Sequence, residues 1–248
     1  MVKARALYAG ASEFKTVLES LSKLVDEACV KFERGGLKLR ALDPANVALI
    51  EVVYPSSAFI EYEIEEEGTW GLNVAAVLRA LGRIRRGDQL KIEVSDDSVI
   101  LEVPSAPKRR YEARNLEVPE PEVPEARLAL RTKVALLADH LRSILKDLEV
   151  VGERATIEYK SSEDALVIYA PGETKYVSKL SRSSGAILEL ESEGDSSSTY
   201  DIDYLLSTLN LSRVSDAVTI EFSSNMPLKM TFRLAGGGNV SYLLAPLV

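Results

Sequence analysis

Two periods of hydrophobic positions alternate along the chain and predict its secondary structure. Apolar stripes at intervals of three and four residues predict helices over Ser12–Val25 and Asn73–Ile84 in the first half. Alternating apolar and polar positions predict strands, because successive side chains of a strand point to opposite faces. The strands expected in this half are 29–33, 37–42, 47–54, 90–94 and 99–103.

The second half repeats this order of elements. Helices are expected over Val134–Leu148 and Ile202–Leu209. A recurrence of the same periodicities in the same order indicates an internal duplication. The sequence therefore predicts an α+β protein of two similar domains. The strands expected in this half are 155–160, 165–170, 176–180, 217–222, 228–234 and 240–245.

A segment rich in proline and glutamate separates the two halves. Leu116-Glu-Val-Pro-Glu-Pro-Glu-Val-Pro-Glu125 holds three prolines, each of which removes a backbone donor. We expect an extended and exposed connector there. The domain boundaries predicted are 1–115 for the first domain, 116–125 for the connector and 126–248 for the second domain.

Composition narrows the class of protein. Hydrophobic residues make up 46% of the chain, enough for a core, and no apolar run approaches the ~20 residues of a membrane-spanning helix. We expect a cytoplasmic, nucleoid-associated protein without a membrane partner. Cys29 is the single cysteine, which excludes an internal disulfide, and His140 is the single histidine. No residue pattern predicts a catalytic centre, a metal site or a cofactor.

The net charge of −8 by itself argues against nucleic-acid binding, but the distribution of the charges along the chain changes this conclusion. Acidic residues gather at 61–67, 117–125 and 189–195, which we place at strand ends and in the connector. Most basic candidates fall on the helical faces opposite the apolar stripes, with Lys15 on the flank of its stripe and Arg213 just beyond the fourth helix. They are either ordinary solvated side chains or phosphate contacts. The candidate DNA-binding residues are Lys15, Lys23, Arg79, Arg83, Arg142, Lys146 and Arg213.

Three segments carry a resemblance to a known family. Leu39-Arg-Ala-Leu-Asp-Pro-Ala-Asn-Val-Ala-Leu49, the run Asp216–Leu228 and the ending Gly236–Pro246 resemble motifs of the archaeal and eukaryotic sliding clamps (proliferating cell nuclear antigen). The order of elements is similar over the whole length. In detail the chain looks most like one subunit of the archaeal clamps that assemble from several paralogous chains.

The resemblance implies a DNA clamp fold, with two inner helices under antiparallel sheets in each domain. Three chains, the same or paralogous, would close into a ring around double-stranded DNA and bind it independently of sequence. The edge strand 108–117 of one chain would pair with the strand around 174–181 of the next, which protects both edges. The interface residues implied are Arg110, Tyr111, Ala113, Lys175, Tyr176, Val177 and Lys179.

The family also docks client proteins through short peptide motifs. The clients implied are DNA polymerase, flap endonuclease, DNA ligase and a clamp loader of the replication factor C type. For Leu42, Val47 and Leu49 of the matching positions, the alternative is an ordinary role in the hydrophobic core. The matching positions are Leu42, Val47, Leu49, Val123, Pro124, Pro227, Leu243, Leu244, Ala245 and Pro246.

Two departures from the family pattern suit a division of labour among unlike subunits. Leu247 follows Pro246 where the family carries a basic residue, and Asn210 stands near the basic position of the fourth helix. The leading function is a non-enzymatic processivity clamp. The alternatives are a checkpoint-type or scaffold protein with the same fold, and a small-molecule enzyme on a duplicated α+β scaffold.

Overall fold

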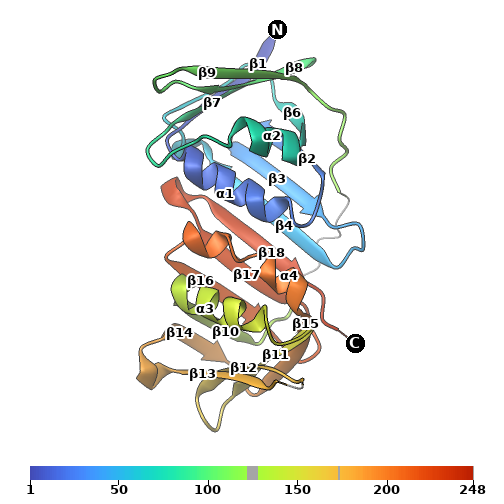
Figure 1. The fold of residues 1–248 in the computed structure, drawn as a ribbon, viewed down its shortest axis with the longest axis vertical. Helices are drawn as coiled ribbons and strands as arrows, with labels where there is room; N and C mark the ends of the chain where they lie inside the picture. The colour runs from blue at the N-terminus through green and yellow to red at the C-terminus, as the bar shows by residue number, and fades with distance from the viewer. Residues whose placement is uncertain (122–127, 173, 248) are drawn as a thin grey trace. The chain divides into compact units, whose positions relative to one another are not determined.

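A computed structural model describes residues 1–121, 128–172 and 174–247 and divides the chain into two compact units. The first unit comprises Met1–Pro44, Ile50–Glu122 and Leu234–Val240, and the second comprises Ala45–Leu49, Val123–Arg233 and Ser241–Val248. Both units run through the same order of one strand, one helix, five strands, one helix and three strands (Figure 1). This order confirms the duplication predicted from the sequence.

The first unit contains two antiparallel sheets. The strand orders are β5-β1-β7-β8-β9 and, within this unit, β4-β3-β2-β6. The elements are β1 (Val2–Tyr8), α1 (Ala11–Leu21), β2 (Glu27–Glu33), β3 (Gly36–Leu42), β4 (Ala48–Pro55), η1 (Ser56–Ala58), β5 (Glu61–Ile64), β6 (Gly68–Asn73), α2 (Val74–Ala80), β7 (Leu90–Ser95), β8 (Ser98–Val103), β9 (Arg109–Arg114) and η4 (Ala235–Gly237).

The second unit repeats both sheets strand for strand. Its orders are β14-β10-β16-β17-β18 and β13-β12-β11-β15. The elements are β10 (Thr132–Leu137), α3 (Ala138–Leu148), β11 (Arg154–Lys160), β12 (Ala165–Ala170), β13 (Tyr176–Ser181), η2 (Arg182–Ser184), β14 (Ile187–Ser192), β15 (Ser196–Asp201), α4 (Ile202–Leu206), η3 (Leu211–Arg213), β16 (Ala217–Phe222), β17 (Leu228–Arg233) and β18 (Asn239–Leu244).

The apolar stripe of each helix faces its own unit's core. Phe14, Val17 and Leu18 of α1 are buried, and so are Leu141 and Leu145 of α3. Full burial of one such side chain stabilises the fold by about 1.5–3 kcal/mol, so these stripes fix which face of each helix remains exposed. In the first unit α1 contacts α2, and in the second α3 contacts α4 (Figure 1).

The helix expected over Val134–Leu148 is wrong at its start. Thr132–Leu137 is strand β10, which pairs with β14 on one side and β16 on the other, and the helix begins at Ala138. The run of apolar residues fits both periods, and tertiary pairing selects the strand. Leu137, which would lie on the apolar stripe of a helix over Val134–Leu148 because it is spaced four residues from Leu141, is 40% exposed.

The other helices are shorter than predicted. α1 ends at Leu21 and α2 at Ala80, so Lys23 and Arg83 lie in the turns that follow. α4 ends at Leu206. In each case the apolar spacing continues into the turn, because the turn residues also pack on the core.

Several strands were not predicted at all: β1, β5, β6, β14 and β15. Strand β5 carries exposed Glu61 and Glu63, and β14 carries exposed Glu189 and Glu191. We had placed these acids at strand ends, whereas they lie along complete edge strands. Charged side chains on an edge oppose pairing with another chain, so these two edges are protected.

The start of the connector is fastened to the first unit. The Asn115 side chain donates to the carbonyl oxygens of Thr69 and Ser95 at 2.8 and 2.9 Å, and accepts from the Gly71 amide at 2.9 Å. Gly71 and Leu116 form an isolated antiparallel bridge. From residue 117 to 121 the chain belongs to neither helix nor strand, as expected for its prolines.

Candidate nucleic-acid interface and docking surfaces

In the first unit, basic side chains occupy the exposed side of the helical layer. The Asn73 side chain caps α2 by accepting from the Ala76 amide at 2.9 Å, which starts the helix and sets its rotation. Arg79 then lies exposed in the last turn, where a cation also favours the helix dipole. On α1, Lys15 is half-buried with its Nζ 3.7 Å from a Glu19 carboxylate oxygen.

The turn after α2 holds a basic cluster that the sequence interpretation missed in part. Arg85 and Arg86 are exposed beside the predicted Arg83. The missed signal was the run Arg83-Ile-Arg-Arg-Gly87, whose basic residues follow the helix rather than lie on it. Three guanidinium groups in one turn suit bidentate contacts to phosphate oxygens.

Asp88 holds this basic turn in shape. Its carboxylate accepts from the Arg85 amide at 2.9 Å, from the Ser105 hydroxyl at 2.9 Å and from the Arg109 guanidinium at 3.1 Å. The hydrogen bond from the Arg85 amide, followed by that from Ser105, lowers the pKa of Asp88 below its ordinary value. Asp88 thus links the turn to the start of β9.

We expect Asp88→Asn to destabilise the protein at neutral pH and much less at low pH. A carboxylate whose folded pKa is depressed contributes stability above its unfolded pKa of about 3.9, and that stability disappears as the pH falls through the folded value. The measurement is the urea midpoint of unfolding from pH 7 to pH 2.5. An equal difference between the variant and the parent at both ends would contradict this role.

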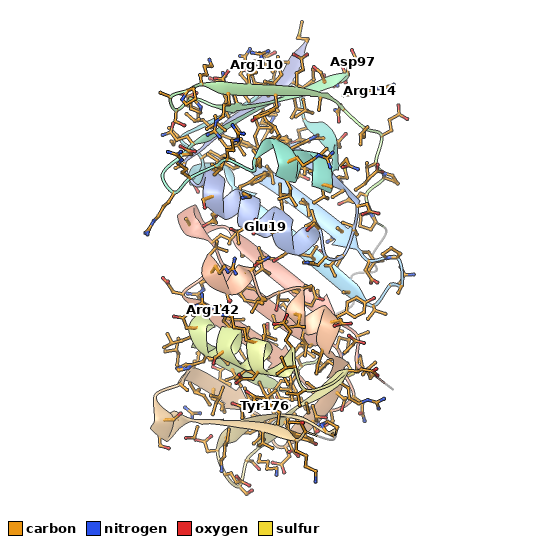
Figure 2. All side chains as sticks on the ribbon, in the orientation of Figure 1. Glu19, Asp97, Arg110, Arg114, Arg142 and Tyr176 are labelled. Atoms are coloured by element: carbon orange, nitrogen blue, oxygen red, sulfur yellow. The ribbon has the colours of Figure 1, made fainter. Side chains whose placement is uncertain are left out.

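In the second unit, α3 and the segment after α4 carry the candidate contacts. Arg142 pairs with Asp139 at 3.3 Å, and Lys146 is exposed one turn further on (Figure 2). Arg213 is exposed at the end of η3, which contacts α3. Asn210 is half-buried just before η3, so this end of the unit carries less positive charge.

The candidate docking residues divide by burial. Leu49 and Leu244 are buried, so they support the fold from within and offer little surface to a client. In the second unit the Ala245 amide donates to the Val47 carbonyl oxygen at 2.9 Å, which brings two candidates together. Val123 and Pro124 lie outside the described residues. The half-buried candidates are Leu42, Val47, Pro227, Leu243, Ala245 and Pro246.

The candidate interface residues lie on or beside two open sheet edges. β9 ends one sheet of the first unit and β13 ends one sheet of the second. Arg110 lies on β9 and Tyr176 on β13, as labelled in Figure 2. Lys175 comes just before β13, and Lys179 pairs with Glu163 at 2.5 Å. Tyr111 and Ala113 on β9 and Val177 on β13 complete the set.

The single cysteine and the single histidine lie in surroundings that indicate packing rather than catalysis. Cys29 is 5% exposed, and burial raises the pKa of its thiol, as expected for packing rather than reactivity. His140 is half-buried. Among residues 1–121, 128–172 and 174–247, no group of three or more potential ligands is placed to hold a metal ion. In the same residues, no helix is long and apolar enough to span a membrane.

Comparison with protein-family models identifies the family of this two-unit fold. Residues 1–119 match the model of the proliferating cell nuclear antigen N-terminal domain, and residues 131–247 match that of the C-terminal domain. The chain belongs to the proliferating cell nuclear antigen family. The two matches correspond to the two halves of the duplication, so the repeat is the family's own architecture.

Relatives in this family are similar over the whole chain. The DNA polymerase sliding clamp 1 of Aeropyrum pernix is 34% identical over 241 residues, which cover 95% of this chain and 97% of the relative. The sliding clamp 1 of Sulfolobus acidocaldarius is 31% identical and covers 98% of both chains. Both relatives are numbered clamps from archaea, in agreement with the resemblance to one subunit type.

Solved structures of the family share the fold. A chain in the PCNA2–PCNA3 complex of Sulfolobus tokodaii superposes with a TM-score of 0.92 at 26% identity and covers 98% of both chains. A. fulgidus PCNA bound to the C-terminal region of FEN-1 superposes with a TM-score of 0.86 at 26% identity, covering 100% of this chain and 99% of that one. The basic helical faces and the two open sheet edges described above lie within this proliferating cell nuclear antigen fold.

Proposed function

We propose that this chain is one subunit of a DNA polymerase sliding clamp. The observation that carries the proposal is the match of both halves to the family, over nearly the whole chain and with the same element order in both units. The clamp is a trimeric ring around duplex DNA, built from this chain and two further clamp subunits, the same or paralogous. It works as a topological tether and catalyses no reaction itself.

The basic helical faces contact the DNA backbone. The residues proposed are the seven candidates identified from the sequence, joined by Arg85 and Arg86 in the turn after α2. Contacts to phosphates carry no sequence information and weaken with salt, as a clamp that slides requires. Near η3 the proposed contact is Arg213, and its neighbour Asn210 brings no charge, so fewer phosphate contacts are expected there than in the turn after α2.

Clients dock on the half-buried apolar positions around Val47 and Ala245, together with the connector. We propose boundaries of 1–115, 116–125 and 126–248 for the two domains and the connector. A peptide with apolar anchors suits such a surface. The clients are DNA polymerase, flap endonuclease, DNA ligase and a clamp loader of the replication factor C type; the FEN-1 complex of A. fulgidus PCNA supports this kind of docking.

Retention on circular DNA tests the function. After loading by the clamp loader, the chain is expected to remain on closed circular DNA and to leave when the same DNA is linearised. It is also expected to increase the length of DNA made per polymerase binding event. Equal retention on circular and linear DNA would indicate ordinary binding and contradict a ring. Retention without any effect on polymerase would favour a scaffold clamp.

A further inference from the structure

The turn that follows α2 is closed on itself through Asp88. The Asp88 amide donates to the Arg85 carbonyl oxygen at 3.1 Å, and the Asp88 carboxylate accepts from the Arg85 amide at 2.9 Å. Gly87 lies between them with a φ of +90°, a conformation that residues with a side chain rarely adopt. Two hydrogen bonds and one glycine thus hold the backbone of residues 85–88 in a single tight turn.

Asp88 also fastens this turn to two other parts of the first unit. Its carboxylate accepts from the Ser105 hydroxyl and from the guanidinium group of Arg109 on β9, and its side chain is only 13% exposed. Its carbonyl oxygen accepts from the amide of Ala11, the first residue of α1, at 3.2 Å. The arginine-rich turn, helix α1 and the start of β9 therefore meet at one residue.

The buried ion pair leaves the arginines of the turn on the outside. Asp88 and Arg109 pair at 3.1 Å with both side chains largely buried, whereas Arg83, Arg85 and Arg86 are exposed. A turn whose backbone is already fixed loses less conformational freedom when its side chains bind a ligand, and this raises affinity. The geometry therefore presents these guanidinium groups from a rigid base.

The second unit has the same turn position but a different side-chain arrangement. The Asp216 carbonyl oxygen accepts from the amide of Ala138, the first residue of α3, at 2.9 Å, as that of Asp88 does from Ala11. The Asp216 side chain, however, is exposed, and the turn before it carries Arg213 followed by valine and serine. The duplication thus separates a backbone role common to both aspartates from the side-chain role of Asp88.

We propose that Asp88 is a positioning residue for DNA binding: by fixing the turn 85–88 it raises the affinity of the first unit for DNA phosphates, in spite of its own negative charge. The proposal rests on the clamp function above, in which this turn contacts the DNA. Electrostatics alone gives the opposite sign, because removing a carboxylate from a basic surface strengthens its attraction for phosphates. The direction of the change therefore distinguishes positioning from charge.

Removal of the carboxylate is compared in the two units. Asp88→Ala is expected to lower the affinity of the assembled clamp for a short fluorescent duplex about tenfold, and to make the slope of log affinity against log salt shallower by about 1.8 for each copy of the chain, as for two lost phosphate contacts. Asp216→Ala removes the same charge and is expected to bind DNA at least as tightly as the parent. Fluorescence anisotropy over a series of salt concentrations measures both quantities.

A second pair of variants leaves the charge unchanged. Gly87→Ala strains the turn through its φ of +90°, and no described atom lies within 4 Å of the added Cβ. Gly185 in the second unit has a φ of +72° and equally open surroundings, so Gly185→Ala carries a similar cost to folding. The affinity and the salt slope are expected to fall for Gly87→Ala and to stay at the parent's values for Gly185→Ala. Equal losses in both variants would show that stability governs binding, and would overturn the proposal.

The dependence of Asp88 on the arginines is tested in combination. In a clamp that already carries Arg85→Ala and Arg86→Ala, Asp88→Ala is expected to cause no further loss of affinity, because it acts through those two side chains. A further tenfold loss in that background overturns the proposal, and so does an unchanged or higher affinity of Asp88→Ala alone. Parent-like affinity of the arginine double variant overturns it as well, since the turn then makes no DNA contact.

These outcomes are distinct from failure of the clamp function. Retention on circular DNA depends on a closed ring, so a clamp that is retained while Asp88→Ala binds the duplex like the parent loses only the positioning role. Equal retention of the parent on circular and linear DNA would instead overturn the function on which the proposal rests.

Discussion

Replacing four basic residues on the helical side of the two units by glutamate is expected to abolish retention on circular DNA while the protein still folds. Phosphate contacts supply the sequence-independent part of DNA affinity. Because the log of the binding constant falls with the log of the salt concentration, each contact removed makes this slope shallower by about 0.9. The positions are exposed or half-buried, so stability is expected to change by less than about 0.5 kcal/mol for each substitution. The residues replaced by glutamate are Arg79, Arg83, Arg142 and Lys146.

A matched reversal separates local contacts from net charge. The control changes the net charge by the same amount but lies on strands, turns and loops rather than on the helices and the turn after α2. Its salt slope and its retention on DNA are expected to match those of the parent. If both variants lose DNA equally, overall charge rather than the helical faces governs binding. The control residues are Arg34, Lys38, Arg131 and Lys229.

The second large effect is expected at Gly71, on β6. A Cβ atom added there would stand 1.9 Å from the Leu116 carbonyl oxygen, so Gly71→Ala must push the start of the connector away from the sheet. That displacement breaks the Gly71–Leu116 bridge and strains the three hydrogen bonds of Asn115. We expect a loss of about 1–3 kcal/mol in the free energy of unfolding, as for overpacked sites.

Gly68→Ala on the same strand is the control for Gly71→Ala. The nearest atoms to its added Cβ lie 3.7 Å away, at ordinary contact distance. Both substitutions restrict the unfolded chain alike, so the difference between them isolates the clash in the folded state. Urea unfolding measures stability, and a fluorescent client peptide measures whether docking weakens with the connector displaced. Equal stability of the two variants would show that the connector is not held at Gly71.

The duplication could be predicted from the sequence because periodicity is a local property. Strand β7 alternates between buried and half-buried residues, and the predicted bounds of β7, β8, β11 and β12 agree with the structure to within one residue. The apolar stripes of α1 and α3 also fixed which faces stay exposed. Lys146 could therefore be placed on the exposed side of α3 from spacing alone, whereas Lys15 and Arg142 are half-buried.

Where two periods fit the same residues, only tertiary pairing decided. The run before Ala138 became β10 because β14 and β16 flank it, and the acidic runs became the edges β5 and β14 because neighbouring strands lie on one side only. No local pattern encodes such partners. A pocket of about 260 Å³ beside β9 has the same origin, because the residues that line it come from β6, α2, β8 and β9 and are distant in sequence.

The sequence by itself thus determined the two-fold repeat, the α+β class, the basic helical faces and the family, because each is written in local spacing or composition. The tertiary structure alone decided where the helices end, which strands are open edges and which apolar residues remain uncovered. Those properties depend on long-range packing, which brings distant segments together.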